Sequence, residues 1–219
     1  MRGRTVLSAL HEGLIYEDIY KNKDALYTML LTTGYLKCVG QKNEYGREWS
    51  ELSLPNREIR SLFDREIIMN LSGGTGESNV FQMLDAMLCG NKEDFADTLR
   101  FILQENVSIH DAAYPETFYH GMMLGFSLLL DGRYEIESNK ESGYGRFDLA
   151  FIPKDKDQAG VILEFKKAQN EDALETRAEE ALKQIEEKAY AASLNKRGVK
   201  NIWKYGIAFC GKRLEMARG

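Results

Sequence analysis

The spacing of apolar residues in the first third of the chain predicts helices around one hairpin. Residues 4–36 have helical periodicity, and residues 57–73 have it again. Between them, two strand-like runs flank the turn-rich stretch QKNEYG at residues 41–46, which predicts a hairpin. Helices, a hairpin and a further helix are typical of a winged-helix arrangement. We therefore expect a mostly helical, winged-helix-like N-terminal region over residues 1–72.

A glycine-rich stretch, SGGTGESN at residues 72–79, follows this region and reads as a linker. It is not a phosphate-binding loop, because such a loop needs Gly, four residues and then Gly-Lys-Ser/Thr, and no lysine follows here. Residues 79–107 have apolar positions at helical spacing, with a break at CGNKED, residues 89–94. We expect residues 73–109 to form a linker and a helical segment.

The second half of the chain alternates between helical and strand-like patterns. A strongly apolar run that begins at Pro115 and closes at Asp131-Gly132 predicts a buried helix. Three strand-like runs, a long amphipathic helix and a last strand come next, at residues 134–138, 145–152, 160–167, 172–193 and 202–211. This order predicts an α/β (α+β) domain over residues 110–219, with one mixed central sheet flanked by helices.

Composition places the chain among globular proteins and narrows the classes of site. At 219 residues and 43% hydrophobic, the chain can bury a substantial core. The three cysteines are scattered with no CxxC pair, so neither a zinc cluster nor a disulfide framework is indicated, and we expect a reducing compartment. The sequence lacks an apolar run long enough for a membrane span. We expect a cytoplasmic protein without membrane contact.

Charge is unevenly distributed along the chain. The formal net charge of -5 argues against a general polyanion binder. Residues 188–218, however, contain eight lysines and arginines and only one acidic residue, Glu215. This basic C-terminal edge is either an ordinary solvated surface or a surface that faces phosphates. On the second reading, Lys196 and Arg197 are candidate nucleic-acid contacts, and Lys167 is a further one. Arg146 is a candidate because the glycines of NKESGYG, residues 139–145, permit close approach of backbone to a phosphate, although a plain hairpin turn explains these glycines as well.

Ionisable residues interrupt two of the apolar strands. Strand side chains alternate between the faces of a sheet, so Glu164 and Lys166 should share one face of VILEFKK. The same rule places Arg146 and Asp148 together, with Phe147 and Leu149 opposite. A charge on the interior side of a sheet costs several kcal/mol unless it is paired or holds a metal. If the two strands pair, two carboxylates and a lysine converge.

Such a convergence suits magnesium-dependent phosphodiester hydrolysis. Magnesium prefers carboxylate oxygens and leaves coordination positions for water and phosphate oxygens. A cation held by Asp148 and Glu164 would lower the pKa of a bound water, and Lys166 would stabilise the charged transition state. The alternative is a plain ion pair, Glu164 with Lys166 or Asp148 with Arg146, on an exposed sheet face.

The arrangement of these residues resembles a known superfamily. Asp148, then 15 residues, then Glu164-Phe165-Lys166 on consecutive strands is similar to the motif of the PD-(D/E)XK nuclease superfamily. That family has an αβββαβ, restriction-endonuclease-like core, which matches the element order predicted above. The blocks ETFYHGMMLG, SNKESGYGRFDLAFIPK, VILEFKKA, EEALKQIEEKAY and YGIAFCGK resemble in particular the C-terminal nuclease-like domain of bacterial proteins that usually begin with an AAA-ATPase-like domain.

The resemblance implies a role for each residue that matches the motif. Asp148 and Glu164 would bind the metal, Mg²⁺ or Mn²⁺, and Lys166 would be the catalytic lysine. Glu116 stands at the place of an additional acidic residue that assists metal binding, although a glutamate in a first helical turn also stabilises the helix. Many relatives have a Gln followed four residues later by a Tyr.

In this sequence the tyrosine follows Gln184 by six residues, at Tyr190. That is roughly 240° further round a continuous helix, so we expect only Gln184 at the site. His120 reads more simply as a satisfied core residue on an apolar helix.

Two classes of function follow. The first is a metal-dependent nuclease acting on nucleic acid, with DNA as the expected substrate. The second is a catalytically inactive nucleic-acid or protein binding module on a nuclease fold. The presence of Asp148, Glu164 and Lys166 together favours the nuclease, since binding alone does not require all three. The resemblance also implies an ATPase-like partner, and a homo-oligomer is open.

Overall fold

The structure is a computed structural model, and it describes residues 5–10, 19, 22–44, 46–106, 116–139, 141–142 and 145–219. Of residues 141–142 and 145–146, only the backbone is described. The chain forms two compact units, residues 1–64 and 65–219. The division falls inside helix α2 (Arg57–Leu71), and the domain limits predicted from the sequence stay predictions. None of the helices in the described part combines the length and apolar composition needed to cross a bilayer.

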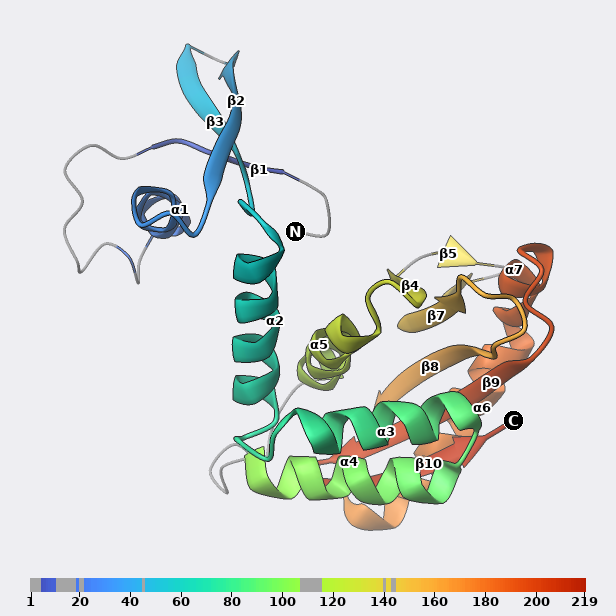
Figure 1. The fold of residues 1–219 in the computed structure, drawn as a ribbon. Helices are drawn as coiled ribbons and strands as arrows, with labels where there is room; N and C mark the ends of the chain where they lie inside the picture. The colour runs from blue at the N-terminus through green and yellow to red at the C-terminus, as the bar shows by residue number, and fades with distance from the viewer. Residues whose placement is uncertain are drawn as a thin grey trace. The chain divides into compact units, whose positions relative to one another are not determined.

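The described residues of the first unit form a small antiparallel sheet and a helix that lies wholly within the unit (Figure 1). Its strands β1 (Val6–Ser8), β2 (Lys37–Glu44) and β3 (Arg47–Ser53) lie in the order β1-β3-β2. The β2–β3 hairpin confirms the prediction from the turn-rich stretch. Helix α1 (Lys23–Thr32) begins where the Asn22 side chain accepts a hydrogen bond from the Asp24 amide, which satisfies one of the free donors of the first turn.

The prediction of helical structure in residues 4–36, with interruptions near Gly13 and the YKNKD stretch, is wrong at β1, whose three residues pair with β3. The pairing depends on a partner that is more than forty residues away in the chain, so local periodicity cannot reveal it. The winged-helix-like arrangement of this unit stays a prediction.

The second unit is built on a five-stranded mixed sheet, in the order β10-β9-β8-β7-β4. Strands β8 (Gly160–Lys167) and β9 (Ile202–Cys210) are parallel, and the other neighbours are antiparallel. The remaining strands are β4 (Tyr134–Ser138), β7 (Leu149–Pro153) and β10 (Arg213–Arg218), and β5 (Glu141–Ser142) with β6 (Gly145–Arg146) forms a separate two-stranded ribbon. The predicted mixed sheet is confirmed.

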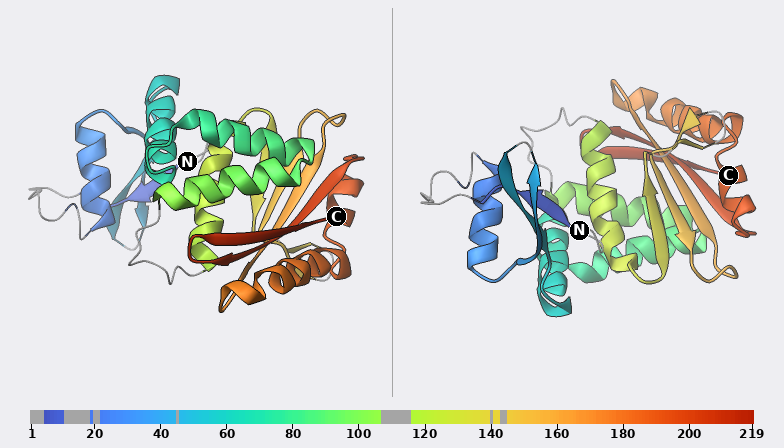
Figure 2. Two further views of the ribbon diagram at one scale, coloured as in Figure 1. Left: turned by 90° about the horizontal axis from the view of Figure 1, so that it is seen from below. Right: turned by 90° about the horizontal axis from the view of Figure 1, so that it is seen from above.

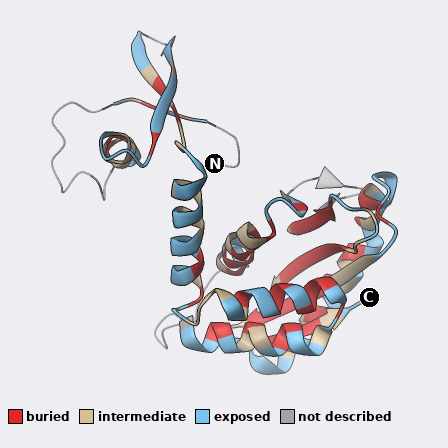
Figure 3. Cartoon of the chain, viewed as in Figure 1, coloured by how far each residue is buried: buried red, intermediate tan, exposed pale blue. Residues whose placement is uncertain are grey.

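Helices cover both faces of this sheet, as Figure 2 shows from two sides. One face packs against α3 (Glu77–Cys89), α4 (Lys92–Asn106) and α5 (Glu116–Phe126), which continues into the 3₁₀ turn η3 (Ser127–Leu130). The other face packs against α6 (Leu174–Glu187), which follows the 3₁₀ turn η4 (Glu171–Ala173), and against α7 (Ala191–Lys196). Figure 3 shows the buried residues concentrated on the strands between these layers. The succession α5-β4-β7-β8-α6-β9 is the predicted αβββαβ core.

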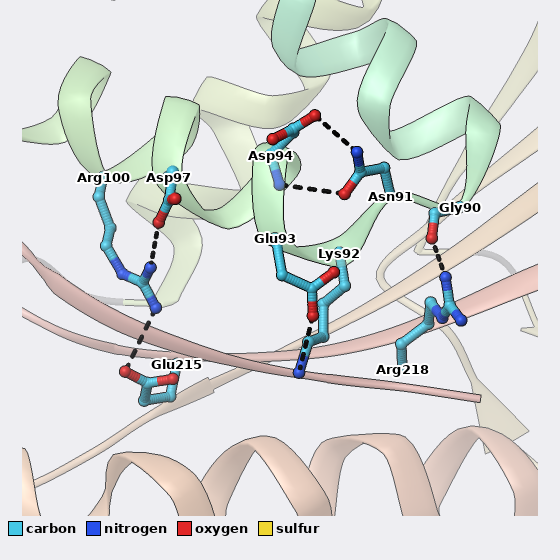
Figure 4. Close-up of polar contacts among 9 residues, drawn as sticks. All are labelled: Gly90, Asn91, Lys92, Glu93, Asp94, Asp97, Arg100, Glu215 and Arg218. Atoms are coloured by element: carbon cyan, nitrogen blue, oxygen red, sulfur yellow. Dashed lines mark hydrogen bonds and ion pairs between the residues drawn. The ribbon is translucent and has the colours of Figure 1, made fainter.

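Side chains from the last two strands anchor the end of α3 and the start of α4. Trp203 Nε1 donates to the Leu88 carbonyl at 3.0 Å, and Arg218 donates to the Gly90 carbonyl (Figure 4). Arg100 of α4 pairs with Glu215 of β10 at 3.3 Å. Carbonyls at a helix C-terminus lack intrahelical donors, so these contacts satisfy them and fix the α3–α4 hairpin to the sheet.

Three details of the second unit differ from the sequence prediction. The expected strand at residues 145–152 is two strands, β6 and β7, because neither Phe147 nor Asp148 pairs in a ladder. The expected helix at 172–193 breaks at Ala189, which has φ 53°. Strand β10 was missed, since its short polar alternation becomes a strand only beside β9. The expected helix start at Pro115 lies outside the described residues.

Candidate active site

Strand β8 brings two of the predicted residues to one face of the sheet. Val161, Leu163 and Phe165 point into the large core under α3, α4 and α5. Ile162 points the other way, into the cluster that contains Ile185 of α6. Glu164 and Lys166 follow Ile162 at intervals of two, and both contact Gln184 of α6. The alternation predicted for β8 is therefore confirmed.

Asp148 lies next to Glu164, although not through the strand alternation that we expected. Phe147 belongs to the cluster on the α6 face, whereas Leu149 belongs to the core on the opposite face. The prediction that these two share a face is wrong, because regular pairing stops at Arg146 and resumes at Leu149. The Asp148 carboxylate instead accepts a hydrogen bond from the Phe165 amide, with Oδ2 2.8 Å from the nitrogen. That bond holds Asp148 against β8.

The Gln184 side chain bridges the two charged residues of β8. Its Oε1 accepts a hydrogen bond from Lys166 Nζ at 2.7 Å, and its Nε2 donates to Glu164 Oε1. Lys166 Nζ also lies 3.7 Å from Glu164 Oε1. Helix α6 comes this close because it passes over Gly206, where a Cβ would lie 2.2 Å from the Ala178 carbonyl oxygen. Gln184 is thus placed at the predicted site.

Tyr190 joins this group, which corrects the expectation from helical geometry. Its hydroxyl lies 3.5 Å from Gln184 Nε2. On a continuous helix the two side chains would point in different directions, but α6 ends at Glu187 and the chain turns through Ala189 at positive φ. The only signal in the sequence was the tyrosine itself, two residues later than relatives place it. The position of the break could not be inferred from it.

Glu164 is a buried carboxyl group with an incomplete set of partners. The residue is 3% exposed, and its Oε2 has no hydrogen-bond partner among the residues that the structure describes. Burial first, and the negative charge of Asp148 second, raise the pKa of Glu164 to about 8, while Lys166 opposes the shift. The ion pair with Lys166 exists, as the simpler reading predicted, but it does not lie on an exposed sheet face, because Glu164 is buried. This ion pair leaves Glu164 Oε2 without a hydrogen-bond partner among the described residues.

Glu116 adds a third carboxyl group from another element. It occupies the first turn of α5. Although Glu116 is exposed at the helix start, partial desolvation of its carboxyl group and then the charge of Asp148 raise its pKa, and Lys166 opposes the shift. These influences indicate that Glu116 lies near both residues. The structure thus brings Glu116, Asp148, Glu164, Lys166 and Gln184 together from α5, the β6–β7 break, β8 and α6.

The predicted nucleic-acid contacts have different surroundings. Lys167 is exposed at the end of β8, and Lys196 is exposed at the end of α7. Arg197 instead pairs with two glutamates of β4, with NH1 3.0 Å from Glu137 Oε1 and NH2 2.5 Å from Glu135 Oε2. Only the backbone of Arg146 is described. The contacts of Arg197 hold the end of α7 to the sheet, and its role toward nucleic acid stays a prediction.

The residues present fit a divalent cation. The carboxyl groups of Glu116, Asp148 and Glu164 interact electrostatically with one another. Glu164 Oε2 is buried and has no hydrogen-bond donor among the described residues, so a bound cation would supply the missing partner. Within the described ranges, however, no three carboxylate, imidazole or thiol side chains stand close enough to form a ready metal site. Glu164 Oε1 is taken up by Gln184, so a bound cation requires side-chain adjustment.

Comparison with known proteins identifies this half of the chain. The model of the PD-(D/E)XK nuclease superfamily matches residues 114–218. No curated protein matches the chain. The matched residues comprise the whole αβββαβ core, and they contain Asp148, Glu164 and Lys166 in the order that the superfamily motif requires. The fold, the motif residues and the family model therefore agree that residues 114–218 match the PD-(D/E)XK nuclease superfamily.

Proposed function

We propose that this protein is a metal-dependent nuclease that hydrolyses phosphodiester bonds in DNA. The superfamily is one of nucleases, and the coarse activity follows from it. DNA as the substrate and magnesium or manganese as the cofactor are our proposals. They are supported by the group of side chains on the α6 face of the sheet.

The observation that carries the proposal is the buried Glu164 carboxyl group, one of whose oxygens has no hydrogen-bond partner among the described residues. A structural ion pair would be expected to satisfy both carboxylate oxygens, since an unsatisfied buried polar atom costs about 1–3 kcal/mol. Glu164 Oε2 has no such partner among the described residues, and Asp148 adds negative charge beside it. An electrostatically unfavourable group of this kind is typical of sites tuned for chemistry.

Asp148 and Glu164 would hold the cation, with Glu116 assisting. When bound, Mg²⁺ or Mn²⁺ lowers the pKa of a coordinated water and stabilises charge on the phosphate. Glu164 would release its proton on binding, because a nearby cation favours the carboxylate form. A bound cation would also lower the pKa of Glu116.

Lys166 supplies the positive charge of the protein itself. Its ammonium group donates one hydrogen bond to Gln184 Oε1, which leaves further N–H donors for a phosphate oxygen. A donor held in place before the reaction stabilises negative charge that develops on the phosphate as water attacks phosphorus and the P–O bond breaks. Gln184 therefore orients Lys166, and Tyr190 lies behind Gln184.

Partners and compartment are further proposals. Nucleic acid is the expected partner, through the proposed contacts Arg146, Lys167, Lys196 and Arg197. Resemblance to domains that accompany AAA-ATPase-like domains supports an ATPase-like partner, and a homo-oligomer is a second possibility. The three cysteines are free, which supports a reducing, cytoplasmic location.

The test is cleavage of labelled single-stranded, duplex and branched DNA and of RNA, with Mg²⁺ or Mn²⁺ and with EDTA. We expect DNA cleavage that requires the metal and disappears in the double variant Asp148→Ala/Lys166→Ala. Equal background cleavage by both proteins on every substrate would refute the nuclease. Binding without cleavage would instead support the inactive binding module.

A further inference from the structure

Asp148 lies at the end of regular strand pairing, where hydrogen bonds from other residues hold its carbonyl and its carboxylate. Asp148 lies in the break between β6 and β7, outside the ladder that pairs β7 with β8. On the other side of β7, the Asn139 amide donates to the Asp148 carbonyl at 2.9 Å. Asn139 itself has φ 51°, a left-handed conformation that asparagine tolerates better than most residues. One main-chain hydrogen bond therefore holds this carbonyl.

His120 provides a second contact to the same carbonyl. Its Nε2 lies 3.2 Å from the Asp148 carbonyl oxygen and 3.0 Å from Ser138 Oγ. A carbonyl oxygen only accepts, so a hydrogen bond to it requires that Nε2 carry the proton. The Ser138 hydroxyl adapts to either tautomer, because it both donates and accepts. With the proton on Nε2 the ring can donate to the carbonyl and to the Ser138 hydroxyl, whereas an unprotonated Nε2 could only accept from Ser138.

His120 also touches the residue that holds the Asp148 carboxylate. Its ring lies edge-on to the Phe165 ring, with centroids 6.2 Å apart and an interplanar angle of 63°. The Phe165 amide in turn donates to Asp148 Oδ2. Helix α5 carries Glu116 one turn before His120, so both residues lie on the same side of the helix.

We propose that His120 is a positioning residue of the active site, whose Nε2–H donates to the Asp148 carbonyl and so orients the Asp148 carboxylate toward β8. This hydrogen bond fixes the Asp148 carbonyl, which belongs to a residue between β6 and β7. The consequence for metal binding rests on the proposed function, whereas the geometry of Asp148 in the metal-free protein does not.

Two variants separate the hydrogen bond from simple packing. His120→Gln retains a side-chain N–H donor, and His120→Leu fills similar space without one. Both are compared with wild type in the metal-free full chain by ¹H–¹⁵N NMR, which reports the Phe165 amide, and two-bond spectra identify the protonated ring nitrogen of wild-type His120. Mn²⁺ binding is measured separately by titration calorimetry.

We expect the Nε2-protonated ring in wild type, a displaced Phe165 amide signal in His120→Leu and a nearly unchanged one in His120→Gln. Mn²⁺ affinity should fall about tenfold or more in His120→Leu and by less than about threefold in His120→Gln, as for residues that orient metal ligands. An Nε2 without a proton, or a Phe165 signal unchanged in His120→Leu, would overturn the inference, and so would equal loss of affinity in both variants.

The ring spectrum needs no variant, so a ring without a proton on Nε2 would overturn the inference even if His120→Leu does not fold. If wild type cleaves no nucleic acid and binds no Mn²⁺, the proposed function fails. The inference is then judged by the ring nitrogen and the Phe165 amide alone.

Discussion

The two faces of strand β8 differ completely in chemistry although they share one backbone. Toward α3, α4 and α5, the strand presents Val161, Leu163 and Phe165, all fully buried in one apolar core. Toward α6, it presents Ile162 and then Glu164 and Lys166, linked through a glutamine. Side-chain alternation lets one strand serve both purposes, because neighbouring residues never share a surface. One face contributes stability, and the other provides chemistry at a cost in stability.

That cost is visible in the electrostatics of Glu164. A buried carboxyl group with a raised pKa and an unpaired oxygen weakens the fold relative to a well-packed apolar residue. Gln184 and Lys166 offset part of the cost by their contacts with Oε1. Burial of the residues on the apolar face offsets the rest of this free-energy cost. Four changes test whether one face of β8 provides stability and the other provides the chemistry.

The largest expected effect is on catalysis, from Asp148→Asn. Loss of one carboxylate charge should lower the rate of DNA cleavage by roughly 10²–10⁴-fold, since it removes a metal ligand. The midpoint of thermal unfolding should change little. Asp172→Asn, at an exposed position of η4, is the matched control and should cleave like wild type. Unimpaired cleavage by Asp148→Asn would show that the polar face does not perform the chemistry.

The second effect is on stability as a function of pH, without metal. A carboxyl group whose pKa rises from 4.5 to about 8 on folding stabilises the native state fully below pH 4.5 and loses that contribution as pH rises through 8. Urea unfolding should therefore show a loss on the order of 5 kcal/mol across this window, at about 1.4 kcal/mol per pKa unit. Glu164→Gln should flatten the curve, whereas the exposed Glu179→Gln should not. Parallel curves for wild type and Glu164→Gln would contradict a strongly raised pKa.

The third change addresses the apolar face. Leu163→Ala should lower the free energy of unfolding by about 2–5 kcal/mol, through lost apolar contact and the cavity left behind. Cleavage should stay near the wild-type rate at temperatures where the variant is folded. Leu124→Ala, on the outer side of α5, should cost much less. If folded Leu163→Ala lost cleavage altogether, the two faces would not be independent.

The smallest effect concerns the contact that joins α6 to the polar face. Gly206→Ala would place a Cβ 2.2 Å from the Ala178 carbonyl oxygen and 2.3 Å from the Leu182 nitrogen, so α6 must move away. We expect a loss of about 1–3 kcal/mol in unfolding free energy, together with slower cleavage as Gln184 withdraws from Lys166. Gly121→Ala meets nothing within 4 Å and should be neutral or slightly stabilising. Equal unfolding curves for the two variants would contradict this account.

Much of the site was predictable because its motif lies on a regular strand. Alternation in β8 is local, and it correctly placed Glu164 and Lys166 on one face. It failed at Phe147 and Asp148, where the chain leaves the ladder and a side-chain hydrogen bond to Phe165 replaces pairing. It also could not find strand β10, which exists only because β9 lies beside it.

The sequence alone determined the αβββαβ order of the core elements and the set of charged residues on them, because periodicity and composition are properties of consecutive positions. The tertiary structure alone decided which distant side chains meet. The break at Ala189 turns Tyr190 back toward Gln184, and the carbonyl of Asp148 finds His120 from another helix. Both depend on backbone conformations that local pattern does not encode, since they are stabilised by contacts between elements far apart in the chain.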